Sequence, residues 1–330
     1  MEYLKSLEKE IKENYNDDLI NTIYIGGGTP SSLNIEELKE LFRIINNNIN
    51  RKKVEEYTIE CNIDSITEEK LILFKQNKVN RLSIGIQSFD KETLEYLNRT
   101  SDVNQIEILM LCKKYFDNIN IDLLYGIPGM NIKKVKYDLE KFLNLDISHI
   151  SYYSLIIEPH TKLYINNTSN IDEDEEYDMY NLVEDTLNKN GYIHYETSNY
   201  AKKDFQSKHN LTYWNNEEYY GFGLGASGFI NNVRYSNTRS ITEYINGNLN
   251  REEELMTKQT NMENEMILGL RKLEGVSKTK FYNKYGIEID KYFDIKDLIQ
   301  DKKLIDENGY LKINKEYIYL SNDILVRFIK

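Results

Sequence analysis

A glycine-rich turn and three polar residues follow predicted strands, and together they could bind a small polar molecule. The turn reads Gly26-Gly27-Gly28-Thr29-Pro30. Residues without Cβ atoms let a ligand contact the backbone directly, although a tight turn into the next helix would have the same sequence. Glu60 and Asp122 add carboxylates suited to an amine or a ribose diol, and Gln87 adds an amide. Each could be an ordinary loop acceptor, but four successive strand ends of this kind predict one shared site.

A histidine in an aromatic segment is the second candidate site. Residues 209–214 read HNLTYW, and they contain His209 and the only tryptophan of the chain. The aromatic residues that follow closely are Tyr219, Tyr220, Phe222 and Phe229. An axial imidazole nitrogen beside an apolar wall is what a flat macrocycle needs. A hydrogen-bonded structural histidine is the alternative, and the residue pattern leaves it open.

Other motifs carry less information. Residues 223–228 (GLGASG) match the G-x-G-x-x-G pattern, but residues 229–235 predict a strand where a dinucleotide site needs a helix N-terminus. We therefore reject a Rossmann site. Arg99 could pair with a ligand carboxylate or could be a surface arginine at a helix end. Cys112 falls on the apolar stripe of a predicted helix, and Cys61 points away from the face used by Glu60.

The composition disfavours several classes of protein. Hydrophobic residues make up 40 % of the 330, which is enough for a packed core. The net charge of −12 disfavours binding to nucleic acid. No apolar run reaches the roughly 18–20 residues that span a bilayer, and the first ten residues lack the apolar stretch of a secretory signal. With two cysteines only, the chain is predicted to be a cytoplasmic protein with reduced thiols.

Alternating strands and helices must position these residues. Short apolar runs predict strands at 22–25, 57–60, 81–86, 119–124 and 149–155. Between them, amphipathic stretches predict helices at 35–49, capped by Asn34 and Glu37, and at 103–116, capped by Asp102 and Gln105. This order is typical of βαβ units in a parallel α/β sheet, whose carboxyl edge binds ligands.

The second half of the chain has a different pattern. Five acidic residues at 172–176 open a predicted helix that ends near Gly191. Residues 192–240 are rich in aromatic and strand-forming residues. From 252 the pattern predicts a helix to 272, helices at 278–285 and 296–301, and strands at 310–313 and 317–320, an order that resembles a winged-helix module. No basic recognition helix accompanies it, so DNA binding is not expected.

Five motifs occur in order: IYIGGGTP at 23–30, ECN at 60–62, SIGIQSF at 83–89, NIDLLYGIPG at 120–129 and IEP at 157–159. Together they resemble the radical S-adenosylmethionine (SAM) heme-chaperone family, relatives of oxygen-independent coproporphyrinogen III oxidase, over essentially the whole chain. The resemblance implies an incomplete parallel (β/α) barrel at 1–165, an aromatic-rich extension at 166–250 and a small winged-helix-like domain at 251–330.

The resemblance also implies roles for individual residues. Positions that match SAM contacts in the family are Gly27, Gly28, Thr29, Glu60, Gln87, Arg99 and Asp122. The glycine loop would meet the amino group of SAM, and Asp122 would face its ribose. His209 opens the HNxxYW motif of the heme-chaperone branch, which implies heme binding and delivery to an acceptor protein. Ser101 stands where the family usually has histidine, which leaves the surroundings of Arg99 open.

One family motif has no counterpart in this sequence. Family members carry Cys-x₃-Cys-x₂-Cys, which holds three irons of a [4Fe–4S] cluster while SAM chelates the fourth. Here residues 2–15 predict a helix, and Cys61 and Cys112 stand 51 positions apart. We expect that the chain is shortened at its start and lacks the first strand of the family fold. It would then lack the cluster ligands and radical chemistry, and the strand at 22–25 would be an unpaired edge of the sheet. A natural cluster-free variant is the second interpretation.

The expected function is that of a heme chaperone of the radical SAM type. The alternatives are an enzyme similar to coproporphyrinogen III oxidase in porphyrin biosynthesis, and a cluster-free scaffold that binds SAM or heme. The sequence leaves open whether the chain is an enzyme.

Overall fold

The computed structural model describes every residue except 100–103, 158–164 and 166–170. Ser101, the predicted cap Asp102 and most of the IEP motif at 157–159 therefore lie outside the described residues. The chain forms two compact units. The sheet unit comprises residues 23–34 and 56–206, and the terminal unit comprises residues 1–22, 35–55 and 207–330. The three segments expected to end at 165, 250 and 330 stay a prediction.

A seven-stranded sheet of order β1-β2-β3-β4-β5-β7-β6 forms the centre of the sheet unit. Its strands are β1 (Thr22–Ile25), β2 (Glu56–Asn62), β3 (Arg81–Gln87), β4 (Asn118–Tyr125), β5 (His149–Ser154), β6 (Ile193–Glu196) and β7 (Asn199–Ala201). Strands β2 to β5 pair in parallel, whereas β7 is antiparallel to β5 and β6. The sheet is the predicted α/β half-barrel, and β1 is an edge strand as expected.

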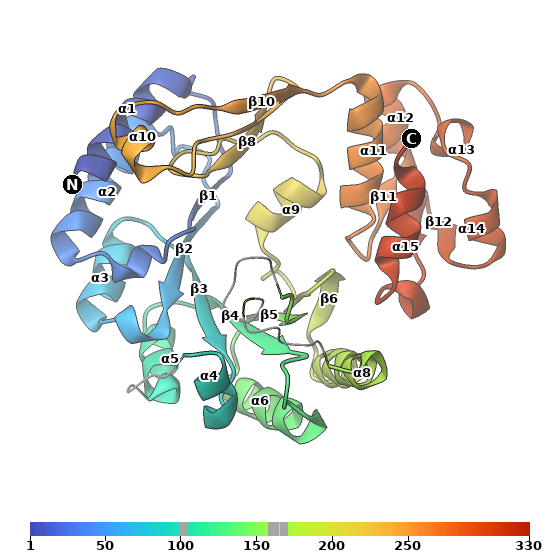
Figure 1. Ribbon diagram of the computed structural model, residues 1–330, viewed down its shortest axis with the longest axis horizontal. Helices are drawn as coiled ribbons and strands as arrows, with labels where there is room; N and C mark the ends of the chain where they lie inside the picture. The colour runs from blue at the N-terminus through green and yellow to red at the C-terminus, as the bar shows by residue number, and fades with distance from the viewer. Residues whose placement is uncertain (100–103, 158–164, 166–170) are drawn as a thin grey trace. The chain divides into compact units, whose positions relative to one another are not determined.

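Helices cover the outer face of this curved sheet (Figure 1). They are α3 (Glu68–Gln76), α4 (Lys91–Tyr96), α5 (Gln105–Lys113), α6 (Ile132–Leu145) and α8 (Glu173–Lys189). The cap of α5 is Asn104, whose side chain accepts from the N–H groups of Ile106 and Glu107, so the predicted cap at Asp102 is wrong. The cap of α8 is Asp172, at the start of the predicted acidic run.

The two faces of the central strands differ in polarity, because successive side chains point to opposite faces. One face carries the in-register row Glu60, Ser83, Asn120 and His149. The residues between them along the strands are apolar and buried, among them Ile59, Leu82, Ile84, Ile119 and Ile121. Parallel sheets ordinarily carry apolar side chains on both faces. The polar inner face therefore indicates a site inside the half-barrel.

The terminal unit contains the first helices, a small antiparallel sheet and a C-terminal module. Its helices outside that module are α1 (Glu2–Asn14), α2 (Ile35–Asn48), α9 (Lys208–Trp214) and α10 (Ile241–Ile245). The sheet has the order β10-β9-β8, formed by β8 (Ser227–Ile230), β9 (Val233–Ser236) and β10 (Glu252–Leu255).

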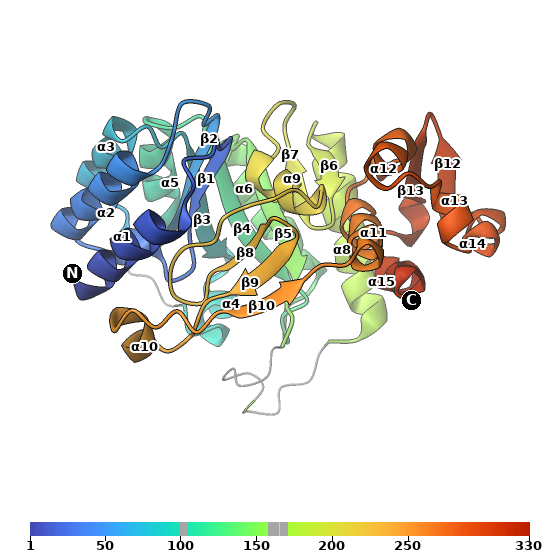
Figure 2. The same cartoon turned by 90° about the horizontal axis from the view of Figure 1, so that it is seen from above.

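The C-terminal module has its own core, to which Met266, Phe281 and Phe328 contribute. Its helices and its β11-β13-β12 sheet lie together in Figure 2. The elements are α11 (Lys258–Gly269), β11 (Val276–Ser277), α12 (Lys278–Tyr285), α13 (Ile289–Tyr292), α14 (Lys296–Gln300), β12 (Leu304–Glu307), β13 (Tyr310–Ile313) and α15 (Ser321–Leu325).

Two strand predictions are wrong because hairpins were missed. The single strand predicted at 229–235 is a hairpin, since Asn231 and Asn232 take φ angles of 52° and 62° and turn β8 into β9. The strand predicted at 317–320 does not form, and Lys315–Tyr317 is a 3₁₀ turn. Strand β13 pairs instead with β12, across Asn308 and Gly309. Asn-Gly is a strong hairpin signal, so this hairpin could have been found.

The helix predicted at 252–272 is also wrong at its start. Glu252–Leu255 is strand β10, which pairs with β9. The helix begins only at Lys258, because the Thr257 side chain accepts a hydrogen bond from the Thr260 N–H and caps α11.

Candidate functional site

The Glu60 carboxylate fixes the conformation of the glycine-rich loop that follows β1. One oxygen of its carboxylate, Oε2, accepts from the Gly27 N–H at 2.9 Å, and the other, Oε1, accepts from the Tyr24 hydroxyl at 2.8 Å. A Cβ on Gly26 would lie 2.6 Å from the Tyr24 ring and 2.8 Å from the Glu60 carboxylate, so a larger residue here would displace one of these side chains. Gly27 has a φ of +100°, which glycine adopts without strain. The sequence placed Gly27 and Glu60 together, but it did not show that they bond to each other.

The far end of the loop is anchored to β2 and α3. The Ser31 hydroxyl accepts from the Asn62 N–H at 2.9 Å and bonds to the Ser65 hydroxyl at 2.6 Å. The Lys70 ammonium donates to the carbonyl oxygens of Ser31 and Ser65, at 2.6 and 3.0 Å. These contacts fix residues 30–32 against the strand that carries Glu60. No sequence pattern predicts them, because most of them join segments more than 30 positions apart.

Asp122 lies inside β4 and not at its end, since the strand continues to Tyr125; the predicted strand-end position is therefore wrong. Its Oδ1 accepts from Asn120 Nδ2 at 2.8 Å. Burial raises the pKa of Asp122, and the hydrogen bond from Asn120 opposes that shift. The carboxylate is thus held on the inner face of the sheet, where a ligand hydroxyl could donate to it.

A buried network continues from Asp122 to β5. Asn120 Oδ1 lies 2.6 Å from His149 Nδ1, and His149 Nε2 lies 2.8 Å from the Tyr195 hydroxyl. Because the amide oxygen can only accept, His149 Nδ1 carries the proton and Nε2 accepts from Tyr195. Burial, reinforced by the Arg81 charge, lowers the pKa of His149 well below its usual value. His149 is therefore a neutral structural residue.

Gln87 ends β3 in an unusual conformation. Its φ of 71° is left-handed, and the register to β4 shifts between Gly85 and Gln87. The following loop is fixed by Asp138 of α6, which accepts from the Ser88 hydroxyl and from the Phe89 N–H, both at 2.7 Å. Burial raises the pKa of Asp138 to about 6. Asp138 thus controls how the chain leaves Gln87, and no sequence pattern singled it out.

Tyr153 of β5 brings the remaining candidates together. Partial shielding from solvent, together with the charges of Asp122 and Glu60, raises the pKa of its hydroxyl to about 12, and the charge of Arg99 opposes this shift. Three of the predicted site residues therefore lie within electrostatic range of one hydroxyl. Arg99 itself is exposed and follows α4, where its N–H donates to the Leu94 carbonyl. Nothing in the sequence distinguished Tyr153 among the 27 tyrosines of the chain.

His209 belongs to the terminal unit and lies in α9, one residue after the start of the helix. Its Nδ1 is 2.8 Å from the Thr22 hydroxyl, and its Nε2 is 2.7 Å from the Tyr213 hydroxyl. The rings of Tyr213 and Tyr219 meet edge to face at 4.6 Å. Both ring nitrogens of a half-buried histidine are therefore oriented by hydroxyl groups.

Two of the aromatic residues predicted for the wall pack on each other and on Tyr15. Tyr220 and Phe222 stack on each other at 5.5 Å, and both pack on Tyr15 after α1. The Tyr220 hydroxyl also donates to Asp18. These two residues pack on the segment that follows α1, and their place in a wall beside His209 stays a prediction.

Residues 223–228 also have a structural role. The Gly223 N–H donates to Glu10 Oε2 at 2.9 Å, and Glu10 of α1 is 2 % exposed. The same carboxylate accepts from Tyr244, Asn237 and Arg251. The segment then enters strand β8, which agrees with the rejected Rossmann site.

Neither cysteine is an exposed thiol. Cys61 and Cys112 are buried, and burial raises the pKa of both thiols, that of Cys112 to about 12. In the described part of the chain, no group of three or more His, Cys, Asp or Glu side chains could hold a metal ion. Within the same residues, no helix is long and apolar enough to cross a membrane.

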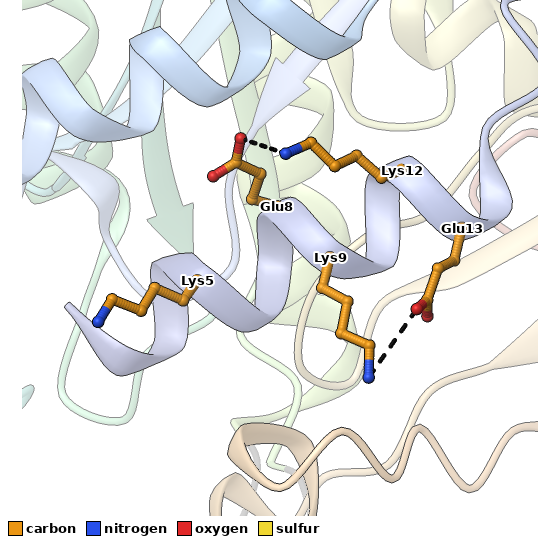
Figure 3. Close-up of a pocket in the computed structure, with 5 residues that line it drawn as sticks. All are labelled: Lys5, Glu8, Lys9, Lys12 and Glu13. Atoms are coloured by element: carbon orange, nitrogen blue, oxygen red, sulfur yellow. Dashed lines mark ion pairs between the residues drawn. The ribbon is translucent and has the colours of Figure 1, made fainter.

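A hollow on the surface of α1 is lined only by charged side chains (Figure 3). They form the ion pairs Glu8–Lys12 at 2.9 Å and Lys9–Glu13 at 3.8 Å, and Lys5 completes the lining. Such exposed pairs on one helix face contribute little energy, and the hollow is not a candidate site.

Comparison with known proteins decides the family. A model of the Radical SAM superfamily matches residues 2–142, and a model of the HemN C-terminal domain matches residues 256–320. The chain is 38 % identical to the heme chaperone HemW of Lactococcus lactis over 99 % of this chain and 89 % of the relative. It is 36 % identical to HemW of Bacillus subtilis over 99 % of this chain and 91 % of that protein. The chain belongs to the HemW family.

A solved structure has the same fold as this chain. Coproporphyrinogen III oxidase (HemN) from Escherichia coli superposes with a TM-score of 0.86, over 99 % of this chain and 82 % of that chain. The two sequences are 19 % identical, so this likeness shows the radical SAM fold alone. The family and fold predicted from the sequence motifs are thus confirmed. The SAM and heme roles of individual residues in this HemW-family chain stay predictions.

Proposed function

We propose that this protein is a heme chaperone that binds heme through His209 and passes it to an acceptor protein. The observation that carries the proposal is the setting of His209, a half-buried imidazole whose Nδ1 lies 2.8 Å from the Thr22 hydroxyl. Metal-binding histidines are typically oriented by such a bond from their other ring nitrogen. The names of the HemW relatives support the same function. A cytoplasmic location stays a prediction, supported by two free thiols.

Heme ligation at His209 would use Nε2. Thr22 would then accept from the protonated Nδ1, which fixes the tautomer with a lone pair on Nε2. The Tyr213 hydroxyl, 2.7 Å from Nε2, occupies this position in the structure. Heme binding therefore requires that Tyr213 release the ring. Release of heme to an acceptor is assisted by the return of the same hydroxyl.

The sheet unit would hold SAM at the loop after β1. The backbone of Gly27, Gly28 and Thr29 faces this position without side-chain obstruction at either glycine, and Asp122 could accept from ribose hydroxyls. In this proposal SAM is a charged nucleoside that the loop binds, and no reaction of SAM is part of the proposed function. Cys61 and Cys112 do not fit the three-thiolate ligand set of a [4Fe–4S] cluster, because both are buried and protonated. The proposed function therefore involves no step through a cluster.

Heme titration of His209→Gln tests the function. The matched control is His194→Gln, which removes a histidine from β6 of the sheet unit. We expect the variant to lose the shift of the Soret band and at least tenfold of heme affinity, while the control keeps both. Transfer of heme to apomyoglobin, followed by stopped flow, then measures delivery. Equal heme affinity in wild type and His209→Gln would contradict the proposal.

A further inference from the structure

Strand β10 is an open edge of the small sheet in the terminal unit. The sheet has the order β10-β9-β8, and in Figure 2 β10 lies on the side of β9 away from β8. The opposite edge is covered, because Tyr219 and Phe229 exchange backbone hydrogen bonds of 2.8 Å in both directions. All four residues of β10, Glu252–Leu255, are exposed. The described chain thus covers one edge of this sheet and leaves the other exposed.

The register of β10 on β9 shows which of its backbone groups point to the open edge. The Met256 N–H donates to the Asn232 carbonyl at 2.7 Å, and residue pairs in an antiparallel ladder are hydrogen-bonded alternately. Glu254, two residues before Met256, therefore bonds to β9. Glu253 and Leu255 lie between the bonded positions, so their N–H and C=O groups point away from β9, and the Leu255 side chain is 71 % exposed. Such an edge is a template for a further strand.

The three glutamates at 252–254 give this edge a negative charge that the described chain does not neutralise. Two arginines lie nearest to them in sequence or in register, and both bond elsewhere. Arg251 pairs with the buried Glu10 at 3.3 Å. Arg234, which is in register with the last of the three glutamates, donates to the Asn216 side chain at 3.3 Å. The edge therefore presents backbone hydrogen-bonding groups flanked by unpaired carboxylates.

Charge decides which kind of strand can pair with this edge. Antiparallel pairing of two β10 strands would place glutamates opposite glutamates, and like charges across a ladder are destabilising. The net charge of −12 adds repulsion between two copies of the chain. Opposite charges across a ladder are stabilising, so the same glutamates favour a basic strand. The edge thus disfavours a second copy and fits a basic extended segment.

We propose that β10 binds an extended basic segment of a partner protein, which adds a fourth strand to the β10-β9-β8 sheet. The outward N–H and C=O groups of Glu253 and Leu255 supply the ladder, as in other complexes in which a peptide extends a sheet. Lysine or arginine side chains of the segment pair with the glutamates, and an apolar side chain of the segment covers Leu255. The same terminal unit contains His209, so the partner docks on the unit for which heme binding is proposed.

Titration of the wild-type protein with short labelled peptides tests this surface. The probe is a fluorescein-labelled peptide of alternating lysine and valine. One control peptide replaces each lysine by glutamate, and the other keeps the lysines but methylates all backbone nitrogens. Each ladder hydrogen bond contributes roughly a 2- to 13-fold factor in affinity. We therefore expect fluorescence anisotropy to show at least tenfold tighter binding of the probe than of either control.

Variants of β10 locate the binding. Leu255→Pro removes an N–H that points to the open edge, where proline is tolerated in strands, and Leu255→Ala is its matched control. The proline variant should bind the probe at least threefold more weakly than the alanine variant. Glu253→Gln should weaken binding about two- to fivefold, whereas Glu69→Gln on α3 should bind like the wild type.

Three outcomes contradict the proposal. Failure of the probe to bind, or equal binding of the fully methylated peptide, means that the edge accepts no strand and that the glutamates only keep β10 from pairing. Self-association of the wild type that Leu255→Pro abolishes assigns the edge to a second copy instead. The methylated peptide decides with wild-type protein if Leu255→Pro does not fold. The probe needs no heme, so His209→Gln should bind it normally, and failure of heme binding is distinguishable from failure of this surface.

Discussion

Replacing Tyr213 by phenylalanine is expected to tighten heme binding. In the structure the Tyr213 hydroxyl bonds to His209 Nε2 at 2.7 Å, the nitrogen that would ligate the iron. Heme binding must break this hydrogen bond, so the free energy of the bond reduces the favourable free energy of heme binding. A neutral hydrogen bond contributes about 0.5–1.5 kcal/mol net, which corresponds to roughly a 2- to 13-fold tighter dissociation constant in Tyr213→Phe. The ring remains to pack on Tyr219.

The assay is a Soret titration of heme into wild type and variant, with the rate of transfer to apomyoglobin measured in parallel. Tyr213→Phe should bind more tightly and release heme more slowly, because the competing hydroxyl is gone. Tyr219→Phe is the matched control. It removes a hydroxyl from a ring that contacts Tyr213, but the ring nitrogens of His209 bond to the hydroxyl groups of Tyr213 and Thr22. We therefore expect wild-type heme affinity in the control. Weaker heme binding in Tyr213→Phe would refute the reasoning, since it would mean that the hydroxyl contacts bound heme.

Further predictions concern the loop, a buried acid and the packing of α1. Gly26→Ala should weaken SAM binding at least tenfold in calorimetry, because a Cβ would meet Tyr24 and the Glu60 carboxylate that holds the loop. Asp138 has a folded pKa of about 6 against 3.8 unfolded, so its protonated form is favoured in the fold. The stability it contributes is present below about pH 4 and falls by about 3 kcal/mol as pH rises through 6, which urea unfolding of wild type, but not of Asp138→Asn, should show. Glu10→Ala should lower the unfolding free energy by roughly 3–5 kcal/mol, because Arg251 and three other donors lose their acceptor. An unaltered urea midpoint in Glu10→Ala would contradict that role.

Local patterns predicted most of the elements correctly. The strands at 22–25 and 81–86 and the helix at 278–285 agree with β1, β3 and α12 within one residue, because apolar periodicity reports which face of an element is buried. The hairpins at 231–232 and 308–309 were missed although the second has the Asn-Gly signal. Tyrosine-rich residues 317–320 have high strand propensity, and tertiary context overrode it.

The ordered motifs of the sequence alone determined the family and the parallel half-barrel. They also placed Gly27 near Glu60, because the carboxyl ends of parallel strands lie at one edge of the sheet. Only the tertiary structure decided which partners those groups have. Glu60 is bonded to the loop backbone, Asp122 lies within its strand, and His209 has Thr22 and Tyr213 at its nitrogens. The polar row of Glu60, Ser83, Asn120 and His149 likewise depends on strand register. Contacts of this kind join residues far apart in the chain, and their existence depends on how the whole fold closes.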